Sequence, residues 1–242
     1  MQTHDFLQAL ARDGEVFADV CGDADLGAPV PGCPEWDIAD LVYHLGRVHH
    51  FWRTIVAEQR DTWEGYEQPE RPADTDLITW YRDGLRATVA TLTAADPAHA
   101  NWTWSTDKTA GFVIRRIAHE TAIHRWDAEA AAGFDTGVEP HLASDGIDEF
   151  LMWFADEAAE GTPRPGGSVH LHCGDVPGEW TVVLNAEGTY DIERAHAKGD
   201  CALRGSASDL LLALWRRRPS SSIDVVGDAE VAARFLAYAA LT

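Results

Sequence analysis

Glu120 and His124 are the residues of this sequence whose types and spacing most directly suggest chemistry. They are four positions apart in residues 112–132, a segment with helical periodicity, and four residues turn an α-helix through about 400°. Both side chains therefore project from one face, one turn apart, where a carboxylate and an imidazole can bind the same ion. A buried Glu and His are costly unless they are paired or bound to a metal. The other members of this face are Val113, Ile117, Asp127 and Ala131.

A third ligand can come from another helix. Residues 37–60 show a helical pattern in which His44 lies among apolar residues that should face the core. A histidine there would complete a set of two histidines and one carboxylate, and ligands on facing helices are the usual way in which bundle cores hold metals. Such a set with an open coordination position suits catalytic zinc, and also iron, nickel or manganese.

Simpler interpretations compete with a metal site. His44 alone can be a hydrogen-bonded core residue, and Glu120 with His124 can be a helix-stabilising pair contributing about 0.2–0.5 kcal/mol. His119 can replace Glu120 as a ligand, although it lies about 100° around the helix. Periodicity does not decide among these alternatives. Two further histidines of the segment 37–60 are expected to face solvent or to support the site from outside the ligand shell: His49 and His50.

The composition limits the partners. The 242 residues include 19 basic and 40 acidic side chains, a net charge of −21, so most of the surface should repel nucleic acid and anionic membranes. No stretch approaches the roughly 18 apolar residues of a membrane span, and residues 1–6 do not resemble a signal peptide. The four cysteines form no CxxC pair, so neither a zinc knuckle nor a disulfide framework is indicated. A cytoplasmic protein with small-molecule partners is expected.

The first 160 residues are predicted to form a helical bundle. Apolar residues recur at helical spacing, and Asp37 is a predicted N-cap while Gly133 is a predicted C-terminal stop. Amphipathic helices joined by connections of modest length favour a bundle. The predicted helices cover residues 3–20, 37–60, 75–92, 112–132 and 140–159.

A Gly- and Pro-rich segment, residues 161–168, is predicted to be the domain linker. After it, short alternating segments predict strands at 169–173, 180–185, 189–193, 202–204 and 223–226. Helices are predicted at 206–217 and from the Asp228 cap to the C-terminus. The predicted domains are therefore 1–160, a helical bundle, and 169–242, an α+β domain.

Three segments resemble one known family. Residues 33–46, which run from Cys33-Pro34 to His44-Leu45-Gly46, resemble the first signature of the mycothiol-dependent maleylpyruvate isomerase family. Residues 119–127 resemble its second signature, an E-x-x-x-H-R-W-D run, and residues 205–228 resemble its C-terminal domain. That family belongs to the DinB-like superfamily of metal-binding helical bundles. The resemblance implies a DinB-like four-helix bundle followed by a smaller C-terminal α/β domain similar to sterol-carrier-type domains.

The resemblance also implies roles for individual residues. His44, Glu120 and His124 would bind the metal with water completing the shell, and Asp127 would be a polar active-site group beside it. Arg217 matches an arginine that holds an anionic substrate or cofactor, but this chain has Arg216-Arg217-Arg218 where the family commonly has Gly then Arg, so the neighbouring arginines stay open as alternatives. A basic helix C-terminus that complements the dipole is the simpler explanation of this run.

The implied activity is a reaction of an external thiol. A divalent metal, for which zinc is the first candidate, lowers the pKa of a thiol that binds to it. None of the four cysteines belongs to the predicted ligand set. A nucleophilic thiol would therefore come from outside the chain. The family resemblance implies that it is mycothiol, whose thiolate would attack an electrophilic small molecule in a cis–trans isomerisation or an S-transfer. Isomerisation needs a pocket for a small dianion, for which Arg82, Arg116 and Arg217 are the candidates. The alternative is a metal-binding module without catalysis; a monomer and a homodimer are both compatible with the sequence.

Overall fold

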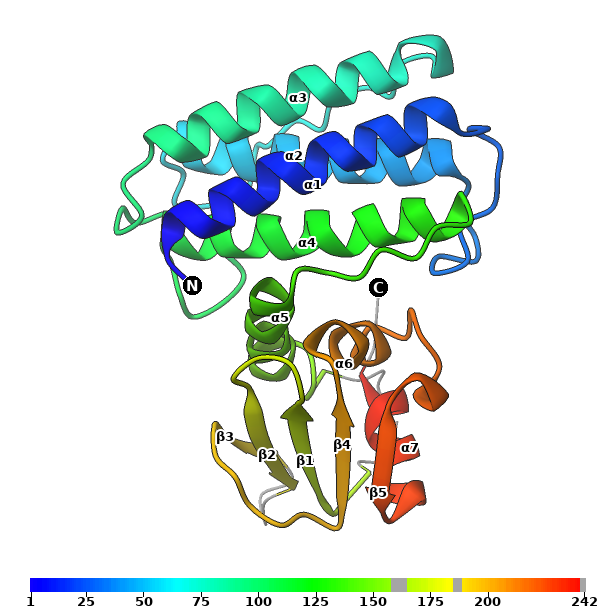
Figure 1. Ribbon diagram of the computed structural model, residues 1–242. Helices are drawn as coiled ribbons and strands as arrows, with labels where there is room; N and C mark the ends of the chain where they lie inside the picture. Colours follow the sequence, from blue (N-terminus) through cyan, green and yellow to red (C-terminus); the bar gives the residue numbers. More distant parts are fainter. Residues whose placement is uncertain (158–164, 185–188, 240–242) are drawn as a thin grey trace. The chain divides into compact units, whose positions relative to one another are not determined.

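The computed structural model describes residues 1–157, 165–184 and 189–239. The chain divides into two units, Met1–Thr136 and Gly137–Thr242. Within the described residues, the first unit consists of four helices (Figure 1): α1 Thr3–Asp23, α2 Ile38–Ala57, α3 Asp74–Ala94 and α4 Ala110–Ala131. The predicted fold class, a helical bundle joined to a smaller α/β domain, is confirmed. The ends of these four helices fall within three residues of those predicted, whereas the helix predicted at 140–159 ends earlier, at residue 153.

Local interactions explain where α2 and α4 begin and end. Asp37 caps α2 by accepting a hydrogen bond from the Asp40 backbone N–H at 2.8 Å, and the Asp40 carboxylate accepts one from the Asp37 N–H in return. The Thr109 hydroxyl caps α4. Gly133, with a φ of +82°, follows α4 in the left-handed conformation that favours glycine at this position. The predicted caps Asp37 and Gly133 are both confirmed.

The core of the first unit lies between the four helices. Its largest fully buried side chains come from all four of them, so each helix contributes an apolar face to one core. Gly46 lets α2 approach α3 closely, because a Cβ at this position would lie 2.2 Å from a ring carbon of Trp80. Buried core side chains include Leu10, Phe17, Leu41, Leu45, Leu77, Tyr81, Leu85, Ile114 and Ile117.

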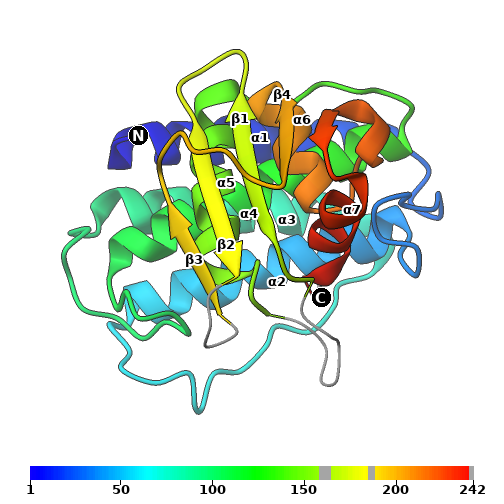
Figure 2. The same cartoon turned by 90° about the horizontal axis from the view of Figure 1, so that it is seen from below.

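The second unit is built around a mixed sheet. Its described elements are α5 Pro140–Trp153, β1 Ser168–Cys173, β2 Glu179–Leu184, β3 Tyr190–Glu193, β4 Cys201–Gly205, α6 Ala207–Leu214, η1 Ser220–Ser222, β5 Asp224–Gly227 and α7 Ala229–Tyr238. The strand order is β3-β2-β1-β4-β5 (Figure 1), and Figure 2 labels its first four strands. Strand β1 pairs with β4 in parallel while the other neighbours are antiparallel. Leu171 is the register partner of both Trp180 and Leu203, so the three side chains are buried on one face of the sheet. The Trp180 indole donates a hydrogen bond to Asp148 of α5, so α5 lies against this apolar face.

The division between the units differs from the predicted domains. The sequence placed α5 at the end of the bundle, within 1–160, but its Phe150 ring lies 5.2 Å from the ring of Trp215, the residue that follows α6. Because the apolar face of α5 packs within the sheet unit, α5 belongs to that unit. Residues 158 and 159 of the predicted helix, and 161–164 of the predicted linker, lie outside the described residues.

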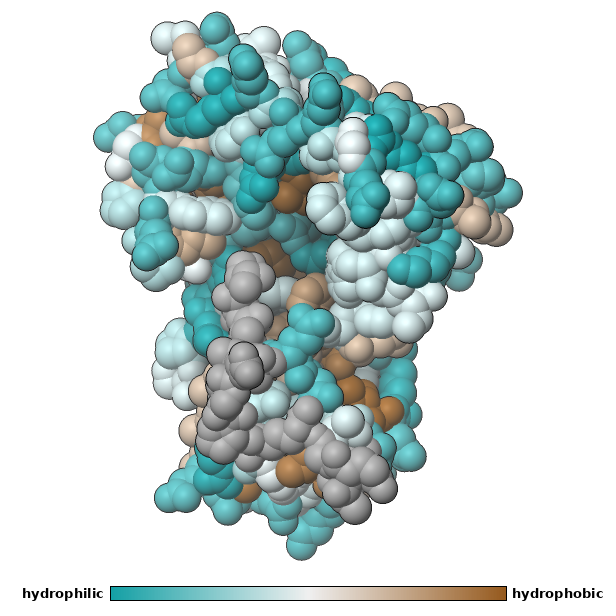
Figure 3. Space-filling model, turned by 180° about the vertical axis from the view of Figure 1, so that it is seen from behind, coloured by the Kyte–Doolittle hydropathy of each residue, from teal (hydrophilic) through white to brown (hydrophobic). Residues whose placement is uncertain are grey.

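None of the helices in the ranges 1–157, 165–184 and 189–239 is long and apolar enough to cross a bilayer. On the face drawn in Figure 3, hydrophilic residues predominate on the helical unit.

Candidate metal centre

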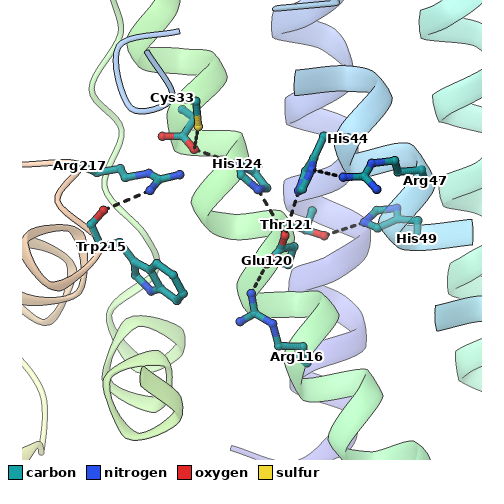
Figure 4. Close-up of polar contacts among 11 residues, drawn as sticks. Cys33, His44, Arg47, His49, Arg116, Glu120, Thr121, His124, Trp215 and Arg217 are labelled. Atoms are coloured by element: carbon teal, nitrogen blue, oxygen red, sulfur yellow. Dashed lines mark hydrogen bonds and ion pairs between the residues drawn. The ribbon is translucent and has the colours of Figure 1, made fainter. Parts of the chain in front are cut away.

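His44 of α2 and the pair Glu120 and His124 of α4 come together in the first unit (Figure 4). The Nε2 atoms of both histidines lie 3.3 Å from the same carboxylate oxygen, Oε1 of Glu120. The two imidazole rings are 5.0 Å apart between centroids and nearly perpendicular, at 75°. The three residues predicted from spacing and from the family resemblance therefore share one point between two helices.

The donor set and its spacing fit a divalent ion. Ligands about 2.0–2.1 Å from a tetrahedral zinc ion are separated from one another by roughly 3.3 Å, the distance found from Glu120 Oε1 to each Nε2. Ordinary N–H···O hydrogen bonds are shorter, with a mode of about 2.9–3.0 Å. The side chains of His44 and Glu120 are 19% and 17% exposed. The set is thus compatible with an ion that keeps one coordination position open.

Arg116 fixes the orientation of the Glu120 carboxylate. One turn earlier on α4, its guanidinium donates from Nη2 to Glu120 Oε2, which leaves Oε1 directed at the histidines. Burial of Glu120 favours the neutral acid, but the Arg116 charge and the hydrogen bonds from His124 and His44 outweigh burial and hold its pKa well below the usual value. Glu120 is therefore an anion at neutral pH, as a metal ligand must be.

Asp127 supports His124 from the other side of the ring. Its side chain is fully buried, and its Oδ2 accepts a hydrogen bond from His124 Nδ1 at 2.9 Å. Burial lowers the pKa of His124, but hydrogen bonds to Asp127 and Glu120 outweigh burial and raise it to about 9. When His124 is neutral, the Asp127 contact keeps the proton on Nδ1 and leaves the Nε2 lone pair facing Glu120. A carboxylate that orients a ligand histidine in this way is a common feature of zinc sites.

Metal binding to this site should release about one proton per ion at pH 7.5. With its pKa raised to about 9, His124 is protonated in the metal-free chain at this pH and must lose that proton to offer Nε2. Affinity should therefore rise about tenfold per pH unit up to about pH 9, and then level off. Zinc titration calorimetry in buffers of different ionisation enthalpy measures the proton count. A count near zero at pH 7.5 would contradict the protonated state of His124.

Replacing Asp127 by asparagine should weaken metal binding by about 10- to 100-fold, the usual cost of losing an outer-shell carboxylate. Asparagine keeps the volume but loses the charge that stabilises the Nδ1–H form of His124. The measurement is competition for zinc against a chromophoric chelator. Asp135, which accepts a hydrogen bond from the Trp126 indole, offers a matched control on the same unit, and Asp135→Asn should leave zinc affinity unchanged.

His44 is held differently from His124. Its Nδ1 lies 3.3 Å from Arg47 Nη2, and because arginine only donates, Nδ1 accepts in that contact while Nε2–H faces Glu120. Burial lowers the pKa of His44, with the Glu120 hydrogen bond opposing, so this ring is neutral at pH 7. To bind an ion through Nε2, the ring must move its proton to Nδ1, and Arg47 must turn away.

The loop before α2 contributes two side chains that sequence reasoning did not assign to the site. The Trp36 ring packs 4.6 Å from the ring of His44, between centroids. Cys33 Sγ lies 3.9 Å from Asp127 Oδ2, so a cysteine does lie beside the site, on the Nδ1 side of His124. Hydrogen bonds from Val30 N–H to Trp36 C=O and from Ile38 N–H to Ala28 C=O hold this loop. Both residues belong to the segment 33–46, and its resemblance to the family signature is the sequence feature that could have assigned them to the site.

The other histidines of these helices lie outside the set. His49 is fully buried, and its Nε2 is 2.8 Å from the Thr121 hydroxyl, so the expectation that it faces solvent is corrected to a buried position, while a supporting role outside the ligand shell stays open. Burial lowers the pKa of His49 to about 3. His50 pairs with the Tyr66 hydroxyl at 2.9 Å. The His119 ring packs edge-on against Phe6, 5.8 Å away, which places it on a different side of α4 from Glu120.

The three arginines considered for a dianion pocket have separate surroundings. Arg82 forms ion pairs with Glu15 and Asp19 of α1, at 2.8 and 2.6 Å, and Arg116 pairs with Glu120. Arg217 belongs to the second unit, where its Nη1 donates to the Trp215 carbonyl at 3.1 Å (Figure 4). Arg82 and Arg116 are thus each committed to carboxylates of the bundle.

Comparison with known proteins gives two family matches that together span most of the chain. Residues 7–129 match the mycothiol maleylpyruvate isomerase N-terminal domain, and residues 141–234 match the domain described as the MDMPI C-terminal domain. No curated protein matches the chain.

Two solved structures share the fold. One is the crystal structure of the mycothiol-dependent maleylpyruvate isomerase, with a TM-score of 0.61 and 10% sequence identity over 93% of each chain. The other is a histidine-to-alanine mutant of the mycothiol-dependent maleylpyruvate isomerase, with a TM-score of 0.62 and 12% identity, again over 93% of each chain. At this identity, the similarity establishes the fold. Since the family domains match in order along the sequence, the chain belongs to the mycothiol-dependent maleylpyruvate isomerase family.

Proposed function

We propose that this protein is a metal-dependent enzyme that uses mycothiol to attack an electrophilic small molecule. The product is a cis–trans isomer, as for maleylpyruvate, or a thiol conjugate. The observation that carries the proposal is the convergence of two imidazole Nε2 atoms on one carboxylate oxygen of Glu120, in a chain of this family. A divalent ion bound there would lower the pKa of an incoming thiol, which makes the thiolate available at neutral pH.

The chain's own residues prepare the site for that reaction. Arg116 keeps Glu120 ionised and oriented, and Asp127 keeps the proton of neutral His124 on Nδ1. The Trp36 ring covers one side of His44 and limits the access of water there. The contacts of Arg116 and Asp127 orient the Glu120 and His124 donor atoms before any substrate arrives.

The attacking thiol comes from outside the chain. Burial raises the pKa of Cys21 and of Cys173 to about 12 and that of Cys201 to about 11, so these three thiols stay protonated and enclosed at neutral pH. Cys33 lies against Asp127, on the opposite edge of the His124 ring from Nε2. A small-molecule thiol is therefore the nucleophile that this site requires.

The test uses the purified chain with mycothiol and two electrophiles. Maleylpyruvate reports isomerisation, and a chromogenic electrophile such as chlorodinitrobenzene reports conjugation. The expected result is activity with at least one of the two electrophiles. A chelator should abolish this activity, and added zinc should restore it. Zinc binding without chelator-sensitive turnover of either substrate would instead support a binding or regulatory module.

Arg217 is proposed to hold the anionic substrate or cosubstrate. All three arginines at positions 216–218 have partners within the second unit: Arg216 donates to the Leu236 and Ala237 carbonyls, Arg217 to the Trp215 carbonyl and Arg218 to Asp209. The match of Arg217 to the family's arginine is what supports this assignment. Arg217→Ala should spare bound metal and raise KM by about 10- to 100-fold, since a hydrogen bond to a charged group contributes about 1.5–3 kcal/mol. Steady-state kinetics with Arg218→Ala as the matched control measure this, and an unchanged KM for Arg217→Ala would move the role to a neighbour.

A further inference from the structure

A second cluster of histidines lies on the sheet of the second unit. His170 and His172 alternate along β1, so both side chains lie on the same face of the sheet, opposite to the apolar face that contains Leu171. The β1–β2 register pairs His172 with Glu179, directly across the strands and on the same face. His196 reaches this cluster from the segment that follows β3, and its ring lies 4.9 Å from that of His170 between centroids.

All three imidazoles converge on one carboxylate oxygen, Oε1 of Glu179. His196 Nδ1 is 2.9 Å from it, His172 Nδ1 is in direct contact with it, and His170 Nε2 is 3.7 Å away. His170 is the enclosed member, since its residue is only 4% exposed, while the Glu179 side chain is 30% exposed. The cluster is thus anchored on a central strand and opens towards solvent through Glu179 and His196.

Hydrogen bonding alone does not account for this arrangement. An oxygen of a carboxylate has two lone pairs, and the His172 and His196 contacts use both of them. The Nε2 atom of His170 is buried and makes no hydrogen bond within the described residues. A buried imidazole nitrogen without a hydrogen-bond partner requires an explanation, and a cation shared with the neighbouring carboxylate supplies one.

We propose that His170, His172 and Glu179 bind a zinc ion on this face of the sheet, with His196 as the fourth ligand. Ligand atoms of the first three lie within 4.8 Å of one another. Imidazole nitrogen with one carboxylate oxygen is a donor set that zinc accepts, and four protein ligands are typical of a structural rather than a catalytic zinc site. The site is separate from the bundle centre, because all four residues belong to the second unit.

A zinc ion there would join three parts of the second unit. His170 and His172 come from β1, Glu179 comes from the start of β2, and His196 comes from the segment that leads to β4. That segment already contacts the same face through the Thr181 hydroxyl, which donates to the Ala195 carbonyl at 3.0 Å. The ion would therefore fix the connection between β3 and β4 against the central strands.

The test measures zinc in the full, untagged chain whose bundle site has been disabled by Glu120→Ala with His124→Ala. This background should retain one zinc ion per chain after exhaustive dialysis, and substitution by cobalt should give the visible absorption of a tetrahedral site. Adding His172→Ala should lower zinc affinity by more than about 100-fold, and Glu179→Gln should lower it by at least tenfold, because losing a ligand costs at least as much as losing a supporting residue. Adding His141→Ala, which removes an exposed histidine of α5, should change nothing.

The outcomes separate this site from the bundle centre. Absence of zinc and of cobalt absorption in the disabled background overturns the sheet site, whatever the unmodified chain shows. Zinc that survives both His172→Ala and Glu179→Gln overturns the ligand assignment. Circular dichroism shows whether each variant folds, and because Glu179→Gln keeps the size of the side chain, it provides a test even if a histidine variant misfolds. The unmodified chain is expected to bind two zinc ions, and the variants of either site are expected to lose one of them.

Discussion

Replacing Glu120 or His124 by alanine is expected to remove the metal of the bundle centre and to reduce thiol-dependent turnover by more than about 100-fold. Removing a residue that only supports a ligand costs up to about 100-fold, and removing a ligand itself should cost more. Both residues supply atoms to the shared point, and Glu120 Oε1 is the atom that faces both Nε2 atoms. Removing Glu120 leaves two neutral donors, while removing His124 leaves one imidazole and the carboxylate. Elemental analysis of dialysed protein, together with kinetics at saturating thiol, measures both effects.

His119→Gln is the matched control for these variants. It removes a histidine from the same helix, adjacent to Glu120, but the His119 ring packs against Phe6. Metal content per folded chain should therefore stay unchanged. Full occupancy of the bundle centre in both Glu120→Ala and His124→Ala would contradict the ligand assignment, and loss of metal in His119→Gln would restore the alternative in which His119 binds the ion.

Gly46→Ala should destabilise the first unit by about 1–3 kcal/mol, the usual cost of overpacking a core. The added Cβ would lie 2.2 and 2.6 Å from two ring carbons of Trp80, so α2 and α3 must separate or the indole must move. Gly46 lies two residues after His44 on α2, and the same displacement should therefore also reduce metal affinity. The midpoint of urea unfolding and a zinc titration measure the two consequences.

Gly84→Ala provides the opposite case in a helix of the same bundle. Gly84 is inside α3, and a Cβ there would meet nothing within 4 Å. Alanine should therefore stabilise this unit by about 0.5–1 kcal/mol, through the smaller entropy that the chain loses on folding. If Gly46→Ala and Gly84→Ala shifted the midpoint of urea unfolding equally, the close approach of α2 to Trp80 would not explain the effect of Gly46→Ala on stability.

The sequence predicted those parts of the fold that depend on local chemistry. Asp37 caps α2 because its side chain reaches a backbone N–H three residues on, and Glu120 and His124 share a face because four residues complete slightly more than one turn. The positions of the strands followed from alternation, which depends only on neighbours along the chain. The family signatures added His44, which spacing alone left open.

Other features depend on tertiary packing, which periodicity does not encode. The placement of α5 with the sheet follows from the packing of Phe150 against Trp215, whose positions in the chain are far apart. The buried environment of His49 follows from its contact with Thr121 across two helices. The position of Cys33 beside Asp127 depends on how the loop before α2 closes.

The order of strands in the sheet has a consequence for how the chain folds during synthesis. All four helices of the first unit are complete once Ala131 has left the ribosome, whereas the central strand β1 gains its parallel neighbour only when Cys201–Gly205 has been made. Pairing of strands distant along the chain is slower than forming local contacts, and N-terminal units generally fold first as they emerge. The bundle should thus be folded while one edge of β1 is still unpaired, and an unpaired strand edge can pair with another nascent chain.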